Sequence, residues 1–448
     1  MRFDPEYYQK KYLNDESVVK EKNASFSGFA ELGIKVDASA FYPSIESFYG
    51  QGNLPFLRVA DVDTVIDFES CTHIPSSLCS RFPTLSKVNP GDIVFTKGGS
   101  VARIGLVTEE AAVSRDLIFL NSSLLSPEDR VFLYLYFQTA FFNRALIRSS
   151  SQTAQPHLTI TLVRQLPVFL ATPRLKSMCL ELVNRAFSAR AKALELKTLS
   201  ENLLTDSLGL NTWGDEDPLS YVCNSNQVLT SARFDSEHFK PKFTKLRELI
   251  LRTGASEKLG ALLIDNQRGN QPIYADEGLP VVNSKHINHG SVQIDSGNRL
   301  GNSKDASILI QAGDVVINGT GVGTIGRSAA YLHESEAIPD NHVTILRAKK
   351  EKIDPVYLAV FLNSQAGQLQ VEQRLRGSSG QIELYPSDLE EFQVWVAPKP
   401  MQRKIREATE GGFRQKQLSN RLLDEARRAV EIAIEENEES AVTYLKAL

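Results

Sequence analysis

Residues 313–326 read GDVVINGTGVGTIG, and residues 91–105 read GDIVFTKGGSVARIG. Each stretch contains a Gly-Asp pair, a run rich in β-branched residues, a cluster of glycines and a final Ile-Gly. A β-branched run favours a strand, and clustered glycines favour a tight turn with positive φ angles. The sequence therefore predicts the same β-hairpin twice, 222 residues apart at the first glycine and 221 apart at the last. The two turns should differ by one residue.

Gly321, Gly323 and Gly326 also have the GxGxxG spacing of a dinucleotide-binding loop. In that motif the glycines open a long helix, whose N-terminal amides bind the pyrophosphate. The sequence that follows, RSAAYLHESEAIPD, is short and contains Pro339, and the first copy lacks the spacing. The hairpin is the favoured interpretation, and a nucleotide-cofactor-binding enzyme stays as an alternative.

The composition is typical of a globular protein with more than one core. The 448 residues are about three times a domain of roughly 150 residues. A net charge of −4 excludes a polycation, so any nucleic-acid contact must come from local basic patches or from a partner. No apolar run approaches the roughly 20 residues of a membrane span, and the opening MRFDPEYYQKKYL has no signal-peptide core. We expect a cytoplasmic protein that contacts no membrane.

Catalytic signatures are absent from the sequence. There is no Walker A loop, no HExxH, no GxSxG and no Asn/Asp-Pro-Pro-aromatic motif of an adenine methyltransferase. The four cysteines, Cys71, Cys79, Cys179 and Cys223, form no CxxC pair, and the seven histidines never gather at ligand spacing. We therefore predict no catalytic residue and no metal ligand in this chain.

The hairpin belongs to a repeat that extends over nearly the whole chain. RFDPEYYQKKY from Arg2 returns as RFDSEHFKPKF from Arg233. The other matched pairs are GNLPFLRVADV (52–62) with EGLPVVNSKHI (277–287), RVFLYLYFQTAFF (130–142) with PVYLAVFLNSQAG (355–367), and QPHLTITLVRQLPVFL (155–170) with QIELYPSDLEEFQVWV (381–396). Each copy mixes strands and helices without βαβ alternation, so the predicted fold class is α+β.

Each copy ends in a long segment with the four-three spacing of a coiled-coil seam. The seams are Leu175, Cys179, Leu182, Ala186, Ala189, Ala193, Leu196, Ser200 and Leu203, then Met401, Ile405, Ala408, Gly412, Gln415, Ser419, Leu422, Ala426 and Ala429. Small residues in the middle of both seams permit close approach, and a two-fold relation between the copies makes the helices antiparallel. We expect two pseudo-two-fold-related globular α+β domains separated by two long antiparallel coiled-coil helices.

The predicted domains follow from the repeat and the seams. They are a first globular domain at 1–172, a spacer helix at 173–207, a polar linker at 208–231, a second globular domain at 232–398, a second spacer helix at 399–436 and an acidic C-terminal tail at 437–448. At about 1.5 Å per residue the first seam is about 40 Å long, close to the ~34–36 Å turn of B-DNA. Two globular domains at that separation could bind two different half-sites on one face of a DNA duplex.

The combined pattern resembles the specificity (S) subunit of type I restriction-modification systems. It consists of Gly-Asp-Ile/Val-Val, a glycine turn, a helix such as VYLAVFLNS, a loop such as RGSSGQ and a helix opened by PKPMQRKI, twice in one chain. The second copy is similar to the family's Pro-x-x-Gln-x-x-Ile helix opening, whereas the first has PRLKSM, with Lys176 in place of Gln402.

The resemblance implies that each globular domain is a target recognition domain for half of a split site in double-stranded DNA. It also implies that the helices dock two copies of a DNA adenine methyltransferase subunit, and that a translocating restriction subunit joins them. S-adenosylmethionine, ATP and Mg²⁺ would belong to those partners, and this chain would hold no cofactor. A non-catalytic protein-interaction scaffold of a related defence complex stays as a second alternative.

Candidate DNA contacts are basic and amide side chains on the predicted loops, because Arg and Lys suit guanine while Asn and Gln suit adenine. A phosphate contact is the commoner role for any one of them. The candidates are Arg58, Lys97, Arg103, Arg148, Ser150 and Gln152 in the first copy, and Asn283, Lys285, Asn318, Arg327, Arg374, Arg376, Ser378 and Gln381 in the second.

Overall fold

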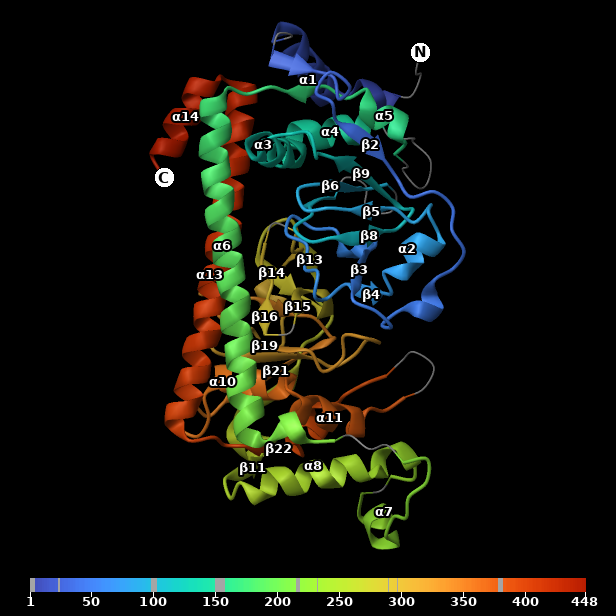
Figure 1. The fold of residues 1–448 in the computed structure, drawn as a ribbon. Helices are drawn as coiled ribbons and strands as arrows, with labels where there is room; N and C mark the ends of the chain where they lie inside the picture. The colour runs from blue at the N-terminus through green and yellow to red at the C-terminus, as the bar shows by residue number, and fades with distance from the viewer. Residues whose placement is uncertain are drawn as a thin grey trace. The chain divides into compact units, whose positions relative to one another are not determined.

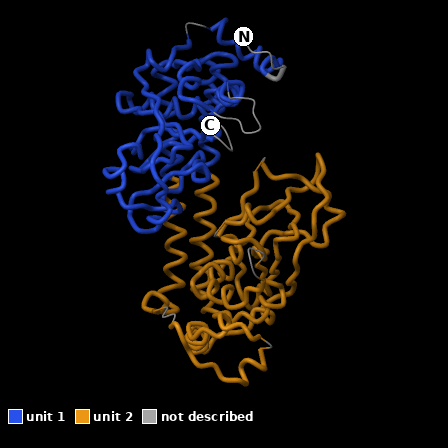
Figure 2. The backbone as a smooth tube through the Cα atoms, turned by 90° about the vertical axis from the view of Figure 1, so that its right-hand side faces the viewer, with its two compact units in different colours: residues 1–188, 418–448 blue, residues 189–417 orange. Residues whose placement is uncertain are grey.

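The chain folds into two compact units, each of which combines sheets with helices. Unit 1 comprises Met1–Ser188 and Leu418–Leu448, and unit 2 comprises Ala189–Gln417 (Figure 2). The computed structural model describes residues 5–22, 25–97, 103–149, 158–214, 218–231, 233–288, 290–295, 297–377 and 382–448. Mostly antiparallel sheets lie beside helices in both units, so the α+β class is confirmed.

In both units a helix precedes the strands of the sheets, and a pair of helices follows them (Figure 1). Unit 1 contains α1 (Lys10–Glu21), β1 (Phe26–Ser27), β2 (Lys35–Asp37), β3 (Leu54–Leu57), β4 (Thr72–Ile74), α2 (Ser77–Arg81), β5 (Lys87–Val88), β6 (Ile93–Thr96), β7 (Ile104–Leu106), β8 (Ala111–Val113), β9 (Leu117–Asn121), α3 (Pro127–Gln138), α4 (Ala140–Ser149), α5 (Ile160–Arg164) and β10 (Val168–Phe169). Unit 2 contains α7 (Ser225–Ser231), α8 (Pro241–Arg252), β11 (Ser256–Lys258), α9 (Leu259–Leu262), β12 (Leu263–Arg268), β13 (Tyr274–Ala275), β14 (Leu279–Val282), β15 (Ile287–Asn288), β16 (Ser291–Val292), β17 (Leu300–Gly301), β18 (Val315–Asn318), β19 (Ser328–Ala330), β20 (Ile338–Pro339), β21 (Val343–Ala348), α10 (Pro355–Asn363), α11 (Gln365–Arg374), α12 (Pro386–Glu390) and β22 (Gln393–Trp395).

The sheets of the two units have matching strand orders. One four-stranded sheet has the order β2-β9-β6-β7 in unit 1 and β12-β21-β18-β19 in unit 2. The other sheet contains β4-β3-β8 in unit 1 and β17-β14-β20 in unit 2, with a parallel pair in the same place. Phe56 lies opposite Ala112 in β3–β8, and Val281 lies opposite Ile338 in β14–β20. The Leu-Pro strands found in the sequence are therefore equivalent in the fold.

The repeated Gly-Asp pair starts the central strand of each first sheet. Gly91 and Gly313 have φ angles of 95° and 89°, which a residue with a Cβ rarely adopts. The buried carboxylate of Asp92 accepts hydrogen bonds from backbone amides at 2.8 and 3.1 Å. The Asp314 carboxylate instead accepts two hydrogen bonds of 2.9 Å from the Arg347 guanidinium. It also accepts one hydrogen bond from a backbone amide. The pair is therefore a structural requirement of the strand start in both units.

The two hairpins are confirmed, but the predicted one-residue difference between their turns is wrong. Phe95 pairs with Ile104, whereas Ile317 pairs with Ser328, so the second turn is longer by two residues. The reason is that the matched Ile-Gly motifs are not equivalent. Gly105 lies within β7, where a Cβ would come within 2.9 Å of a backbone oxygen, whereas Gly326 lies in the turn with φ 82°. Glycine is therefore required for lack of space at Gly105 and favoured by the positive φ angle at Gly326.

Two long helices, α6 (Pro173–Leu208) and α13 (Lys399–Glu435), each contribute one half to each unit. In unit 1 the first half of α6 and the second half of α13 share one hydrophobic core. In unit 2 the second half of α6 meets the first half of α13, where Gly412 lies against Ala193 and Leu196. The predicted antiparallel course of the helices is therefore confirmed.

The predicted seam residues face the interior of the helix pairs. Ala193, Leu196 and Leu203 are partly buried. Met401 and Gln415 are also partly buried. The buried positions are Leu175, Cys179, Leu182, Ala186, Ala189, Ser200, Ile405, Ala408, Gly412, Ser419, Leu422, Ala426 and Ala429. Lys176, which replaces Gln402 in the first copy, forms an ion pair of 2.7 Å with Asp129. Gln402 instead accepts from the backbone amide of Asp354 at 2.8 Å, so each helix start is tied to its unit by a different polar contact.

The C-terminal residues form a packed helix and not the expected tail. Helix α14 (Glu438–Lys446) belongs to unit 1, and its Ala441, Val442 and Leu445 are buried. The predicted linker also contains a short helix, α7. In the described part of the chain, each helix is either too short or too polar to cross a lipid bilayer.

Candidate nucleic-acid interface

The turn between β18 and β19 in unit 2 is held by a buried amide. Asn318 is fully buried, and its Nδ2 donates to the carbonyl oxygens of Ser284 at 3.0 Å and Thr324 at 3.2 Å. Because its amide is used inside the unit, Asn318 has a structural role in this conformation. The sequence placed Asn318 among the candidate base contacts, and that role stays a prediction.

Positive-φ glycines shape the tip of this turn. Gly321 and Gly323 have φ angles of 97° and 79°, and Val322 between them is 70% exposed. The segment continues into strand β19, so no helix follows that would bind a pyrophosphate as the GxGxxG motif requires. The glycines serve a β-hairpin here, as the sequence comparison of the two copies indicated.

Several predicted loops of unit 2 meet at the start of the same turn. The Asn318 amide connects it to the segment that follows β14. Thr320 forms a β-bridge with Glu383, and the amide of Leu384 donates to the carbonyl of Gly319 at 2.9 Å. The amide of Gly319 donates to the carbonyl of His342 at 2.8 Å. The structure thus brings together segments near residues 284, 320 and 383, together with the start of β21.

The corresponding turn of unit 1 is anchored at its two ends. The amide of Arg103 donates to the Thr96 hydroxyl at 3.0 Å, and the amide of Lys97 donates to the backbone carbonyl of Asp116 at 2.9 Å. The backbone carbonyl of Lys97 also accepts from the amide of Leu158, so the loop before α5 is hydrogen-bonded to this turn. Arg103 is exposed and Lys97 is partly buried, whereas the tip at 98–102 lies outside the described residues.

Arg58 and Asn283 occupy equivalent positions just after the Leu-Pro strands. Both begin a short 3₁₀ turn. Nε of Arg58 donates to Asp61 at 3.1 Å, and the Asn283 side chain accepts from the amide of Lys285 at 3.2 Å. Local bonds therefore occupy both side chains, while the Lys285 side chain in unit 2 is exposed.

Arg148 lies in the last turn of α4 and Arg374 is the last residue of α11. Both guanidinium groups contact aromatic rings and backbone carbonyls of the same unit. The Arg148 guanidinium lies 4.2 Å from the Tyr7 ring centre and donates to its carbonyl at 3.0 Å. Arg374 donates to the carbonyl of Glu391 at 3.1 Å and lies 5.2 Å from the Phe392 ring centre. Burial lowers the pKa of the Arg374 guanidinium to about 10. These two arginines hold helix ends in place.

Arg376 and Arg327 complete the described candidates. Arg376 forms an ion pair of 2.6 Å with Asp388, yet half of its side chain is exposed. Arg327 is partly buried at the end of the turn, and its Nε has no partner among the described residues. The remaining candidates, Ser150, Gln152, Ser378 and Gln381, lie outside the described residues.

Sequence reasoning missed Arg268, Tyr385 and His342, which lie at the same junction. The Arg268 guanidinium lies 5.5 Å from the Tyr385 ring centre and donates to the carbonyl of Gly319 at 3.4 Å. His342 is exposed beside the turn. No motif marks these residues in the sequence, because they reach the turn only through strand pairing.

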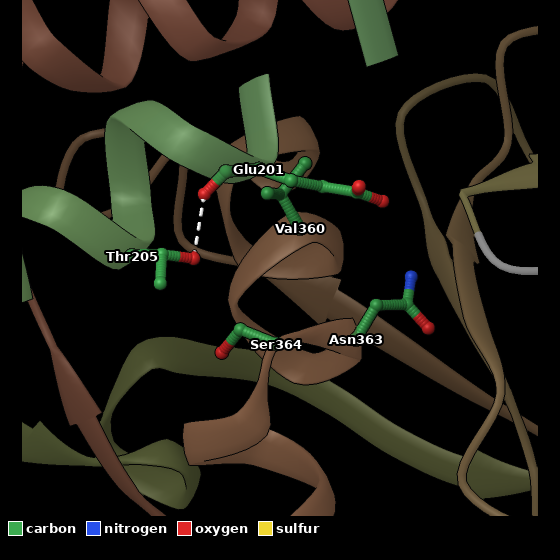
Figure 3. Close-up of a pocket in the computed structure, with 5 residues that line it drawn as sticks. All are labelled: Glu201, Thr205, Val360, Asn363 and Ser364. Atoms are coloured by element: carbon green, nitrogen blue, oxygen red, sulfur yellow. Dashed lines mark hydrogen bonds between the residues drawn. The ribbon is translucent and has the colours of Figure 1, made fainter. Parts of the chain in front are cut away.

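A pocket of unit 2 shows how the two copies differ at the long helices. It lies where α6 meets the end of α10, and it is lined by Glu201, Thr205, Val360, Asn363 and Ser364 (Figure 3). The repeat places Glu431 of unit 1 where unit 2 has Thr205. Glu431 accepts a hydrogen bond from the first amide of α4, that of Ala140, at 3.1 Å. The start of α11 has no side-chain cap from Ser364, which donates instead to Phe361.

Exchanging these residues should exchange the caps. We expect Glu431→Thr to destabilise unit 1 by about 1 kcal/mol, because it leaves the amide of Ala140 without its acceptor. Thr205→Glu should stabilise unit 2 by a comparable or smaller amount, and the neutral Thr205→Gln is its control. Amide hydrogen exchange at Ala140 and Gln365 measures both effects. Unchanged exchange at Ala140 in Glu431→Thr would contradict the cap.

The chain is similar to solved specificity subunits over most of its length. The S subunit of a type I restriction-modification system from M. genitalium is 13% identical, the alignment covers 92% of this chain and 93% of that chain, and the TM-score is 0.36. The HsdS subunit from Thermoanaerobacter tengcongensis is 12% identical, with 92% and 94% covered and a TM-score of 0.28. A structure described under complex assembly and conformational transition of the type I R-M system is 15% identical, with 76% and 83% covered and a TM-score of 0.27. No family model and no curated protein matches the chain.

Proposed function

We propose that this chain is the DNA sequence-recognition subunit of a type I restriction-modification complex. The observation that carries the proposal is that one α+β topology occurs twice, with a hairpin turn of different length and sequence in each copy. Strands and their starts are kept by packing, whereas turns at a strand end are free to vary and to bind. Two related binders with different turns suit a DNA site made of two different half-sites.

Each unit has cationic side chains around its turn for contact with double-stranded DNA. In unit 1 these are the exposed Arg103 and the partly buried Lys97. In unit 2 they are the exposed Lys285 and Arg376 and the partly buried Arg327. Most contacts of this kind go to phosphates and set position, and a smaller number read base edges. The net charge of −4 fits a chain that shares DNA binding with a partner.

The long helices supply docking surfaces for the partners in this proposal. Helices α6 and α13 bind two copies of a DNA adenine methyltransferase subunit, and a restriction subunit joins the complex. The partners carry the catalytic groups and bind S-adenosylmethionine, ATP and Mg²⁺. This chain contributes the choice of site and the assembly of the complex, and it makes or breaks no bond.

The test is to co-express the chain with the methyltransferase encoded beside it and to map adenine methylation in the host DNA. We expect a split, asymmetric motif with a fixed gap of unspecified bases. The control complex contains a copy of this chain in which a Gly-Ser linker replaces residues 319–326. That complex should lose selection at one half-site and keep it at the other.

Three outcomes contradict the proposal or a part of it. Methylation without site preference by a stable complex would show that the chain does not choose the site. No methylation by a complex whose methyltransferase is competent would favour a scaffold that binds other proteins. Loss of selection at both half-sites on replacement of one turn would contradict the assignment of one half-site to each unit.

A further inference from the structure

We propose that His342, oriented by Thr320, is a DNA contact of unit 2 and takes part in choosing its half-site. This inference rests on the proposed function and adds a residue pair that no sequence pattern marks. His342 directly precedes β21, and its side chain is exposed. Its backbone carbonyl accepts a hydrogen bond from the amide of Gly319, the residue that follows β18.

The backbone of His342 is fixed on both sides. Its carbonyl accepts from the amide of Gly319 at 2.8 Å, and its amide donates to Oδ1 of Asp340 at 2.9 Å. Asp340 is itself buried. Because both its N–H and its C=O are hydrogen-bonded, the backbone of His342 keeps its position relative to the turn. His342 therefore belongs to the same rigid edge as the turn.

The imidazole is fixed as well. The Thr320 hydroxyl lies 2.7 Å from Nδ1 of His342, so one ring nitrogen is committed to the turn. Among the described residues Nε2 has no partner, and it lies on the opposite side of the ring from Nδ1. Thr320 is itself positioned by its β-bridge with Glu383. This arrangement commits one ring nitrogen to the turn and leaves the other for a further hydrogen bond.

The surroundings suit a nucleic acid. Lys285 is exposed next to Ser284, whose carbonyl receives the Asn318 amide from this same turn. The Arg268 guanidinium lies behind Gly319, where an added Cβ would come within 2.5 Å of its nitrogen. Two acidic side chains lie close to this edge: Glu383, which is 3.9 Å from Arg268, and the buried Asp340, whose carboxylate accepts from the amide of His342 at 2.9 Å. Lys285 and Arg268 therefore belong to segments that hydrogen bonds join to the turn.

With the Thr320 hydroxyl donating to Nδ1, Nε2 carries the ring hydrogen, and as a donor it matches the acceptors that DNA offers at its surface. These are the phosphate oxygens and, in the major groove, N7 of a purine. The two cases differ in their consequences. A phosphate contact strengthens binding to every sequence, whereas a contact to N7 changes which base is preferred. Thr320 acts as a positioning residue in both cases.

The experiment uses the full complex of this chain with its methyltransferase. The variants are His342→Ala, Thr320→Val and Thr320→Ser, with Lys350→Ala as a control for an exposed cation at the far end of β18. We measure duplex affinity at several salt concentrations, the methylation rate, and the methylated motif. Urea unfolding and near-ultraviolet circular dichroism verify that each variant keeps its fold.

We expect His342→Ala to lower duplex affinity and methylation about tenfold, within the range for one good polar contact. Thr320→Val should lower both by a smaller factor, because the ring stays but loses its orientation, and Thr320→Ser should restore them. Lys350→Ala should stay within about twofold of the wild type. A motif relaxed at one base identifies a base contact. An unchanged motif with an affinity that falls equally for every sequence identifies a phosphate contact and contradicts the part of His342 in site choice.

An affinity of His342→Ala equal to that of the wild type overturns the inference, whatever the motif. Equal losses in Thr320→Val and Thr320→Ser contradict the orienting role of the hydroxyl. The proposed function is judged separately by the wild-type complex, which has to show a preferred motif. A wild-type complex without a motif, but with an affinity that falls in His342→Ala, leaves His342 as a contact of a non-specific DNA-binding surface and removes its part in site choice.

Discussion

Removal of residues 437–448 is expected to destabilise unit 1 by about 4 kcal/mol, because α14 is part of its core. Its buried Val442 and Leu445 each contribute roughly 1.5–3 kcal/mol when withdrawn from water. The Glu438 carboxylate also accepts the amide of Thr172 at 3.0 Å, directly before α6 begins. A helix start that loses its acceptor costs about 1 kcal/mol more.

The measurement is urea unfolding, with amide hydrogen exchange to assign the loss to unit 1. Glu438→Ala and Glu439→Ala form a matched pair, because both carboxylates lie in the first turn of α14 and only Glu438 reaches Thr172. We expect Glu438→Ala to lower stability by about 1 kcal/mol and Glu439→Ala to have little effect. A shortened chain as stable as the full one would show that residues 437–448 are the tail that their acidic sequence predicts.

Gly412→Leu is expected to destabilise unit 2 by about 3 kcal/mol. A Cβ at Gly412 would lie 3.2 Å from the backbone oxygen of Ala193 and 3.6 Å from Cβ of Leu196. The backbone of α6 cannot yield as a flexible side chain would, so a leucine has to push the two helices apart. The close approach of α6 and α13 in this unit therefore depends on the absence of a side chain at this position.

Gly411→Ala is the matched control in the same helix turn. A Cβ there would lie 3.2 Å from the end of the Leu196 side chain, which can rotate. Alanine also gains up to about 1 kcal/mol of helix propensity over glycine. We expect Gly411→Ala to be neutral or stabilising and Gly412→Leu to lower the midpoint of urea unfolding. Equal tolerance of the two substitutions would mean that the helices are not in close contact at Gly412.

The duplication and the α+β class were predictable because both depend on patterns along the chain. Alternating apolar residues, clustered glycines and heptad spacing each report a local geometry, and their recurrence reports a repeated unit. The same reasoning identified the GxGxxG spacing as a hairpin, since the first copy has the hairpin without the spacing. It failed at the Ile-Gly motifs, where Gly105 and Gly326 are glycines for unrelated steric reasons.

The composition of the interface could not be predicted to the same degree. Residue type alone placed Asn318, Arg148 and Arg374 among the DNA contacts, whereas their hydrogen bonds commit them to holding a turn and two helix ends. An amide or a guanidinium suits a base edge and a backbone carbonyl equally well. Only the surrounding backbone determines which of the two it meets.

The sequence by itself determined that this protein is built from one α+β unit used twice, with two long helices, because those features follow from local periodicity. The tertiary structure alone decided that α14 completes unit 1, that the helices approach closely at Gly412, and that His342 joins Thr320 at the turn. Each of these depends on residues brought together from distant parts of the chain, and no spacing within a single segment records such contacts.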